Sequence, residues 1–219
     1  MNWLRAGVLG ANDGIVSTAG LVVGVAGATA ATGPVLTAGI AGVVAGAVSM
    51  ALGEYVSVSS QRDTERSLLA RERAELDLFP DEELDELTAL YVAKGLKQET
   101  ARQVAEELTG HDAFAAHADV ELGIDPHALT NPLHAAGASA IAFVLGSALP
   151  LVAILVPPPG ARIAVTFVVV LFALAVTGVV SAHLGAAGKV AAVVRLVAGG
   201  ALAMLVTFGI GQLVGATVL

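Results

Sequence analysis

Most of the charged residues in this 219-residue chain lie in one block, residues 61–130, between two long stretches that are nearly free of charge. The block holds 17 of the 19 acidic residues and 7 of the 11 lysines and arginines, so its net charge is −10, whereas the rest of the chain carries +2. Apolar residues make up 56% of the chain, and the mean hydropathy is +0.80. A soluble core of this size does not need such long uncharged stretches. The pattern predicts a membrane protein with an acidic soluble module.

Five stretches are long enough to cross the ~30 Å hydrocarbon layer of a bilayer as helices. They cover residues 14–31, 35–53, 133–156, 163–182 and 196–219. Short links with glycine and proline, at 32–34 and 157–160, join the first pair and the next pair into helical hairpins. The predicted fold is all-α: an integral membrane protein with five transmembrane helices and a helical metal-binding domain between the second and third. The predicted divisions are 1–60, 61–130 and 131–219.

Lysines and arginines near the ends of the spans indicate the orientation. If the N-terminus is cytoplasmic, Arg5, the four arginines within 62–73, Lys189 and Arg195 all lie inside, and Arg162 lies outside. Residues 61–130 are then cytoplasmic and the C-terminus faces outward. The high content of alanine, glycine and valine and the short N-terminus indicate a bacterial inner (plasma) membrane.

The first span has a second interpretation, a cleaved signal peptide. Arg5 precedes an apolar run, and residues 28–30, Ala-Thr-Ala, resemble a cleavage site for signal peptidase. Asp13 near the start of the run and the second span directly after Pro34 favour a retained hairpin. The chain has no cysteine, so it has neither disulfides nor a thiolate metal site.

Two acidic residues, Asp13 and Glu54, lie within or at the edge of a predicted span. A carboxylate in hydrocarbon costs at least about 2–3 kcal/mol, so such a residue is a candidate for function by default. Asp13 and Ser17 share one helix face with three glycines, at positions 20, 24 and 27. Glycines at this spacing let two helices approach closely, so Asp13 is predicted to face a partner helix instead of lipid.

The second span has a similar glycine-rich face that carries Met50, and Glu54 lies one turn beyond. A carboxylate together with a thioether suits ferrous iron better than magnesium or sodium. Two alternatives stay open at this point. Met50 and the glycines form only a packing seam, or Asp13 is an interfacial acid in contact with water.

The acidic block predicts several soluble helices. Residues 62–76 continue the second span because no glycine or proline interrupts them before Pro80, and further helices are expected after Pro80, over 97–108 and near 113–122. Carboxylates recur at helical spacing within these segments, at Glu65, Glu72 and Glu75, at Glu83 and Glu86, and at Glu121 with His117. Helical bundles with inward acids bind iron or manganese in this way. The alternative is a set of solvated helix faces.

Two motifs resemble a known family. Residues 12–18, Asn-Asp-Gly-Ile-Val-Ser-Thr, with the glycine-rich run 21–27 after them, and residues 49–55, Ser-Met-Ala-Leu-Gly-Glu-Tyr, look like the vacuolar iron transporter family. This family includes the yeast vacuolar iron and manganese importer, and the likeness covers essentially the whole chain. The acidic domain places the chain with the iron-transporting branch, since the nodulin-like branch lacks that domain. The resemblance implies a homodimer with a path at the interface of the first spans and exchange of cytosolic metal for protons.

By motif match, the resemblance implies that Asp13 and Met50 bind metal in the membrane. It also implies that the cytoplasmic domain binds metal through Glu72, Glu75, Glu83, Glu86 and Glu121. Well-characterised members have two methionines just before the last glutamate, where this chain has His117 and Ala118. Imidazole binds iron, manganese or zinc, so this departure bears on metal preference more than on metal binding.

The expected function is transport of a divalent metal, ferrous iron or manganese, out of the cytoplasm in exchange for protons. No enzyme activity, prosthetic group or nucleic-acid partner is expected, and iron, manganese or zinc would be bound as substrate. The predicted metal residues are Asp13, Met50, Glu54, Glu72, Glu75, Glu83, Glu86, His117 and Glu121. Two alternatives are a membrane-anchored iron sensor, which does not need Asp13, and a ferroxidase-like protein. The second needs Glu-x-x-His pairs, which the block lacks.

Overall fold

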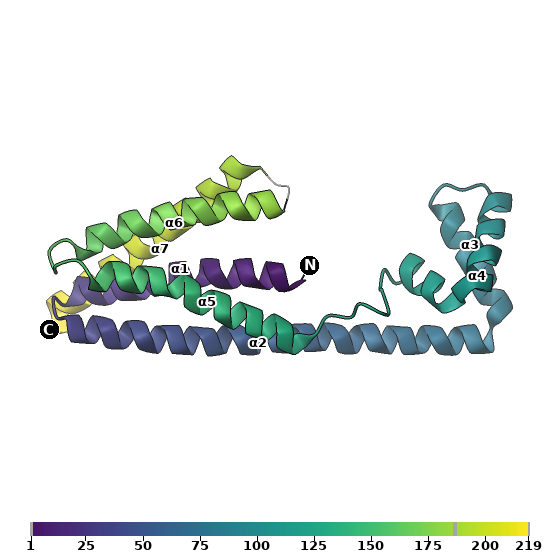
Figure 1. Cartoon of the computed structure of the whole chain (residues 1–219), viewed down its shortest axis with the longest axis horizontal. Coiled ribbons are helices and arrows are strands. Elements are labelled where there is room, and N and C mark those ends of the chain that lie inside the picture. Colours follow the sequence, from purple (N-terminus) through teal and green to yellow (C-terminus); the bar gives the residue numbers. More distant parts are fainter. Residues whose placement is uncertain (1, 186–187, 219) are drawn as a thin grey trace. The chain divides into compact units, whose positions relative to one another are not determined.

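The computed structural model describes residues 2–185 and 188–218, and within these residues it contains helices and no strands. The helices are α1 (Asn2–Ala28), α2 (Thr32–Leu78), α3 (Pro80–Ala93), α4 (Gln98–Val120), α5 (Pro132–Leu155), α6 (Arg162–Leu184) and α7 (Lys189–Val218) (Figure 1). Among them, α1, α2, α5, α6 and α7 are long and apolar enough to cross a membrane. The prediction of an all-α membrane protein is confirmed.

The chain divides into two compact units. The first, here the membrane unit, comprises Met1–Val56 and Pro132–Leu219, and the second, here the acidic unit, comprises Ser57–Asn131. Helix α2 belongs to both units, because it continues without a break through the end of its apolar part to Leu78. The predicted continuation of the second span as one long helix is therefore confirmed.

Helix boundaries in the membrane unit differ from the hydropathy pattern at three places. The connection between α1 and α2 is residues 29–31, so the predicted link 32–34 instead forms the first turn of α2, where Pro34 is tolerated. Helix α1 begins at Asn2 and α7 at Lys189, both before the predicted apolar spans. Hydropathy marks only the part of a helix that lipid surrounds, whereas backbone hydrogen bonds continue until a residue breaks them. Residues 2–13 contain no proline, so nothing in the sequence stops that helix earlier.

Helix α1 is the packing centre of the membrane unit and contacts α5, α6 and α7 (Figure 1). Glycines bring the backbones together: a Cβ atom on Gly14 would overlap the carbonyl oxygen of Phe143, and one on Gly211 would overlap that of Gly24. The first contact joins α1 to α5 and the second joins it to α7. Backbone contacts of this kind are typical of fixed helix pairs in membranes.

The membrane part of α2 packs much less closely. In its most hydrophobic window 11% of the residues are buried, against 44% for α1. Val35 at its start is buried in the core of the membrane unit, and further along side chains of other helices lie against its glycines: Leu151 against Gly39, Leu21 against Gly42, and Phe143 against Gly46. Helix α2 is thus the least buried of the five apolar helices within the described residues.

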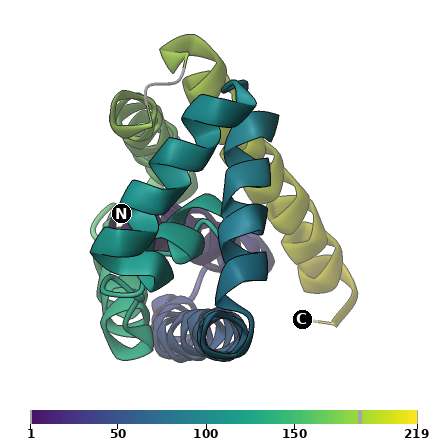
Figure 2. The same ribbon diagram turned by 90° about the vertical axis from the view of Figure 1, so that its right-hand side faces the viewer.

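In the acidic unit, α3 and α4 lie side by side (Figure 2), around a small core of Leu87, Ala105 and Ala116. Helix α4 is broken at Asp112, whose backbone is extended (φ −162°, ψ 93°) and whose carboxylate accepts the Ala115 N–H at 2.9 Å. That bond is a helix N-cap, and the break agrees with the two separate segments that the sequence predicted here. The break starts a new helical segment in which His117 is directed into the unit.

Candidate metal sites

A buried cluster in the acidic unit joins three helices. Glu72 of α2, Glu83 of α3 and His117 of α4 are 2%, 7% and 0% exposed, and each offers one ligand atom within 4.8 Å of the others. Nδ1 of His117 lies 2.9 Å from Glu72 Oε1 and 3.5 Å from Glu83 Oε2. Glu121, one turn after His117, places Oε2 3.5 Å from the same nitrogen. The break at Asp112 and the tight hairpin of α3 and α4 bring these residues together.

The cluster is not satisfied by its own hydrogen bonds. Among the described residues, both His117 nitrogens and Glu72 Oε1 are buried without a hydrogen-bond partner, so the 2.9 Å contact lacks hydrogen-bond geometry. Buried polar atoms are nearly always paired, and each exception needs an explanation. A divalent cation would use the imidazole lone pair and carboxylate oxygens at once. Nitrogen and oxygen donors suit ferrous iron, manganese and zinc.

Burial and mutual repulsion alter the acidity of the cluster. Burial, together with the negative charges of Glu121 and Glu83, raises the pKa of Glu72 from 4.5 to about 7. Burial and the charge of Glu86 also raise the pKa of Glu83, and His117 acts in the opposite direction. A folded unit that holds these carboxylates ionised is therefore under electrostatic stress without a cation. Bound metal would relieve that stress.

We expect the metal-free acidic unit to lose stability as the pH rises. The Glu72 pKa is higher in the folded than in the unfolded chain, so between pH 4.5 and about 7 the folded state binds more protons and each rise in pH favours unfolding. Urea unfolding of a 57–131 fragment in chelator should give a free energy of unfolding about 1–3 kcal/mol lower at pH 8 than at pH 5.

Glu72→Gln is the control for this titration, because the amide keeps the shape of the side chain and cannot ionise. The pH dependence should become much weaker in that variant. Manganese should stabilise the wild-type fragment more at pH 8 than at pH 5, since metal displaces the protons. Stability that increases from pH 5 to pH 8 in chelator would contradict this account of the cluster.

The other predicted acids of the unit lie at the margin of the cluster. Glu75 forms an ion pair with Arg71, with 3.0 Å between Glu75 Oε1 and the Arg71 guanidinium, and Glu86 is exposed. The set of ligand atoms within 4.8 Å comprises Glu72, Glu83 and His117, and Glu121 joins it through its 3.5 Å contact with His117. Glu65, on the same helix as Glu75, accepts the side-chain amide of Gln61 at 2.8 Å. The structure thus brings together Glu72, Glu83, His117 and Glu121, and places Glu75 and Glu86 around them.

A second candidate site is a cavity of about 180 Å³ in the membrane unit. Asp13 of α1 and Met50 of α2 both line it, together with Ser17, Thr18 and Ser49. Leu21, Gly42, Gly46 and Phe143 complete the wall. The two residues that the sequence suggested for metal binding in the membrane therefore face one space. A carboxylate, a thioether and three hydroxyls are a donor set that a ferrous or manganous ion can use.

Some residues that line this cavity were not predicted as site residues from the sequence. Thr18 and Phe143 were not predicted; the Thr18 hydroxyl donates to Ser147 at 2.9 Å, and Ser147 donates to the Gly14 carbonyl at 3.2 Å. These bonds fasten α1 to α5 beside the cavity. Glu54, which was predicted, is partly exposed and does not line the cavity. It lies one turn of α2 beyond Met50.

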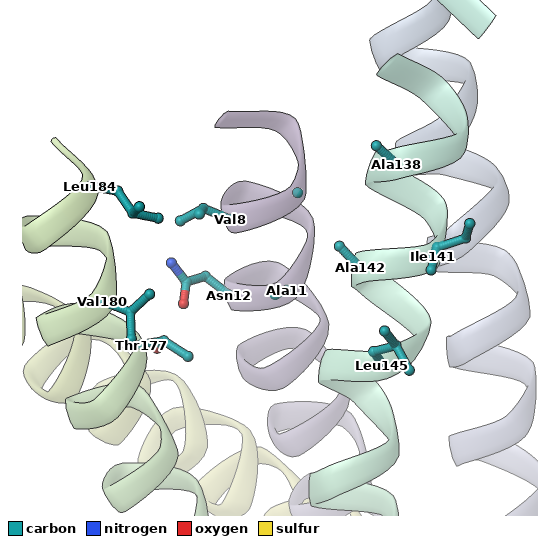
Figure 3. Close-up of a pocket in the computed structure, with 11 residues that line it drawn as sticks. Val8, Ala11, Asn12, Ala138, Ile141, Ala142, Leu145, Thr177, Val180 and Leu184 are labelled. Atoms are coloured by element: carbon teal, nitrogen blue, oxygen red, sulfur yellow. The ribbon is translucent and has the colours of Figure 1, made fainter. Parts of the chain in front are cut away.

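A larger cavity of about 440 Å³ lies between α1, α5 and α6. Figure 3 shows the amide of Asn12 directed toward α6, near Val180 and Thr177, with Ala138, Ala142 and Leu145 on the α5 side. The lining is otherwise aliphatic. One amide and one hydroxyl are too few ligands for a divalent ion. Asn12 and Asp13, adjacent in the motif, thus line different cavities.

The chain matches the VIT family over residues 4–212. It belongs to the VIT family. It is 44% identical over 212 residues to a vacuolar iron transporter of Acanthamoeba castellanii, which covers 96% of this chain and 78% of that protein. It is 39% identical over 214 residues to vacuolar iron transporter homolog 1 of Oryza sativa, covering 97% and 74% of the two chains. The family expected from the two motifs is therefore confirmed.

A third relative, vacuolar iron transporter homolog 2.1 of Arabidopsis thaliana, is 36% identical over 214 residues and covers 97% of this VIT-family chain and 82% of that protein. These relatives come from an amoeba and two plants, and their names refer to the vacuole. They give no support to the predicted bacterial inner membrane. The family and the five apolar helices agree on a multi-pass membrane protein.

Proposed function

We propose that this VIT-family chain carries ferrous iron, and manganese as a second substrate, out of the cytosol in exchange for protons. The single observation that supports this most is the membrane cavity in which Asp13 and Met50 meet. An ionisable acid within a membrane span costs free energy, so its presence there marks a candidate functional residue. The names of the relatives support iron as the cargo.

The carboxylate of Asp13 is the group that would exchange a proton for the metal ion. A metal ion binds the ionised carboxylate, so binding releases any proton held there, and release of the metal lets a proton return. Ser17 does not compete for the carboxylate, because its hydroxyl donates to the main-chain oxygen of Asp13 at 2.6 Å. Met50 adds a soft ligand that favours ferrous iron over magnesium.

The acidic unit would capture metal before transport. Four donors from three helices, Glu72, Glu83, His117 and Glu121, would hold the ion with the marginal acids Glu75 and Glu86 around them. The distribution of lysine and arginine supports a cytosolic location for this unit. His117 in place of a thioether shifts the expected preference of this site toward manganese and zinc relative to the methionine-containing members.

The poorly buried membrane face of α2 supports a homodimer. Large apolar side chains on it, such as Val44 and Leu52, are 58% and 59% exposed. A second copy would cover this face and complete the wall of the cavity around Asp13. The path for the ion would then run along the first two helices of both copies.

Uptake into proteoliposomes tests the proposal. The purified protein is reconstituted, ferrous iron and manganese are supplied separately, and uptake is followed with the vesicle lumen acidic or at the external pH. Uptake that depends on the acidic lumen, with iron ahead of manganese, is the expected result. Metal that binds to the protein without crossing the bilayer would instead support the sensor.

A further inference from the structure

Leu21 and Gly42 lie at the end of the membrane cavity opposite Asp13 and Met50. The cavity lies between α1 and α2, which a short connection joins as an antiparallel hairpin. Leu21 is two turns after Asp13 on α1, and Gly42 is two turns before Met50 on α2. Because the two helices are antiparallel and the two spacings are equal, Asp13 and Met50 lie at one end of the cavity. Leu21 and Gly42 lie together at the other end.

The side chain of Leu21 lies against Gly42, and this position, here called its seat, exists only because residue 42 is glycine. A Cβ atom at position 42 would overlap Cδ2 of Leu21, which is the far end of a flexible side chain. Leu21 is nevertheless 39% exposed within the chain. It therefore fills the space over Gly42 on one side and has open space on the other. A change of rotamer is enough to vacate the seat.

Phe143 differs from Leu21 in this respect. Its ring lies against Gly46, its carbonyl oxygen lies against Gly14, and the residue is 2% exposed. It is held from both sides and forms a fixed wall of the cavity. Leu21 and Phe143 both line the cavity, and Leu21 is the one of these two that can move.

We propose that Leu21, seated over Gly42, is the apolar gate that closes the metal cavity on the side away from Asp13 and Met50. This inference rests on the proposed transport function. A hydrated divalent ion cannot pass an apolar constriction without losing water that the constriction does not replace. With Leu21 seated, an ion at Asp13 is separated from the far side, and when Leu21 leaves Gly42 the ion can pass.

Leu21→Ala tests the gate in the full-length protein in proteoliposomes. The smaller side chain cannot fill the space, so metal flux without a pH gradient and proton leak without metal should both increase several-fold over wild type. Gly42→Ala should act in the same direction, because its Cβ displaces Leu21. The double variant L21A/G42L moves the side chain to α2 and should bring both leaks back toward the wild-type level.

Leu36→Ala is the matched control, since Leu36 has the same exposed fraction of 39%, lies on α2 and does not line the cavity. It should leave both leaks at the wild-type level. If both leaks stayed at the wild-type level in L21A and in G42A, the gate would be refuted, whereas transport itself would not. Leaks in L21A that the double variant does not reduce would also overturn it. A wild-type protein that moves no metal would instead refute the proposed function.

Chemical labelling gives a readout that does not depend on transport. The chain contains no cysteine, so Ser17→Cys places a single thiol in the cavity wall. A membrane-impermeant thiol reagent added on the side of the connection between α1 and α2 should label this thiol slowly in an otherwise wild-type protein and several-fold faster when Leu21→Ala is added. Equal rates in the two proteins would contradict the gate.

Discussion

Asp13→Asn is expected to reduce metal transport to the level of liposomes without protein. The amide keeps the size of the side chain but removes the negative charge that attracts a divalent ion in a low-dielectric setting. It also removes the group that exchanges a proton for the metal. Both the rate of ferrous iron uptake and its dependence on the pH gradient should therefore disappear together.

Glu54→Gln is the comparison for this variant. Glu54 is the other acid at the edge of a span, but it does not line the cavity with Asp13. Its change to glutamine should leave most of the transport and its pH dependence. If the two variants lost transport equally, the site would extend beyond the cavity. If Asp13→Asn transported normally, the assignment of Asp13 would be wrong.

Glu83→Gln is expected to reduce the affinity of the acidic unit for manganese by at least about 10–100-fold, the range found when a residue that merely orients a metal ligand is lost. Glu83 is 7% exposed and its Oε2 lies 3.5 Å from the His117 nitrogen, so it would contact the ion directly. Titration calorimetry on the full-length protein with Asp13→Asn in the background isolates this site from the membrane cavity.

Glu82→Gln is the matched control, because it makes the same chemical change one residue away at an exposed position. It alters the net charge of the unit equally, so it reports the nonspecific effect of losing one acid. We expect a change well below that of Glu83→Gln. Equal losses in the two variants would mean that the unit attracts cations through its overall charge, with no defined site.

The sequence was sufficient for much of the fold because the signals were strong and local. Long apolar runs marked the membrane helices, and the absence of glycine and proline between Gly53 and Pro80 predicted that α2 continues out of its apolar part. The ends of α1 and α7 were missed because hydropathy measures surroundings, not backbone hydrogen bonding. The two segments 97–108 and 113–122 were predicted as separate, but the cap by Asp112 that separates them was not.

The candidate sites were harder to predict, since they depend on contacts between distant segments. Helical spacing suggested Glu72, Glu83 and the pair of His117 and Glu121, but nothing in the spacing indicated that the three carboxylates meet at one nitrogen of His117. The same spacing gave equal weight to Glu75, which pairs with Arg71, and to Glu86, which is exposed. Leu21 carried no signal at all, because its role depends on the glycine opposite it on another helix.

Proton movement driven by metal alone tests the central claim most directly. Wild-type protein is reconstituted with a pH indicator inside the vesicles and no imposed pH gradient, and ferrous iron is then added outside. The account predicts that protons leave as iron enters, so the lumen becomes alkaline in wild type and stays unchanged in Asp13→Asn. Iron entry with no change in luminal pH would contradict exchange of metal for protons.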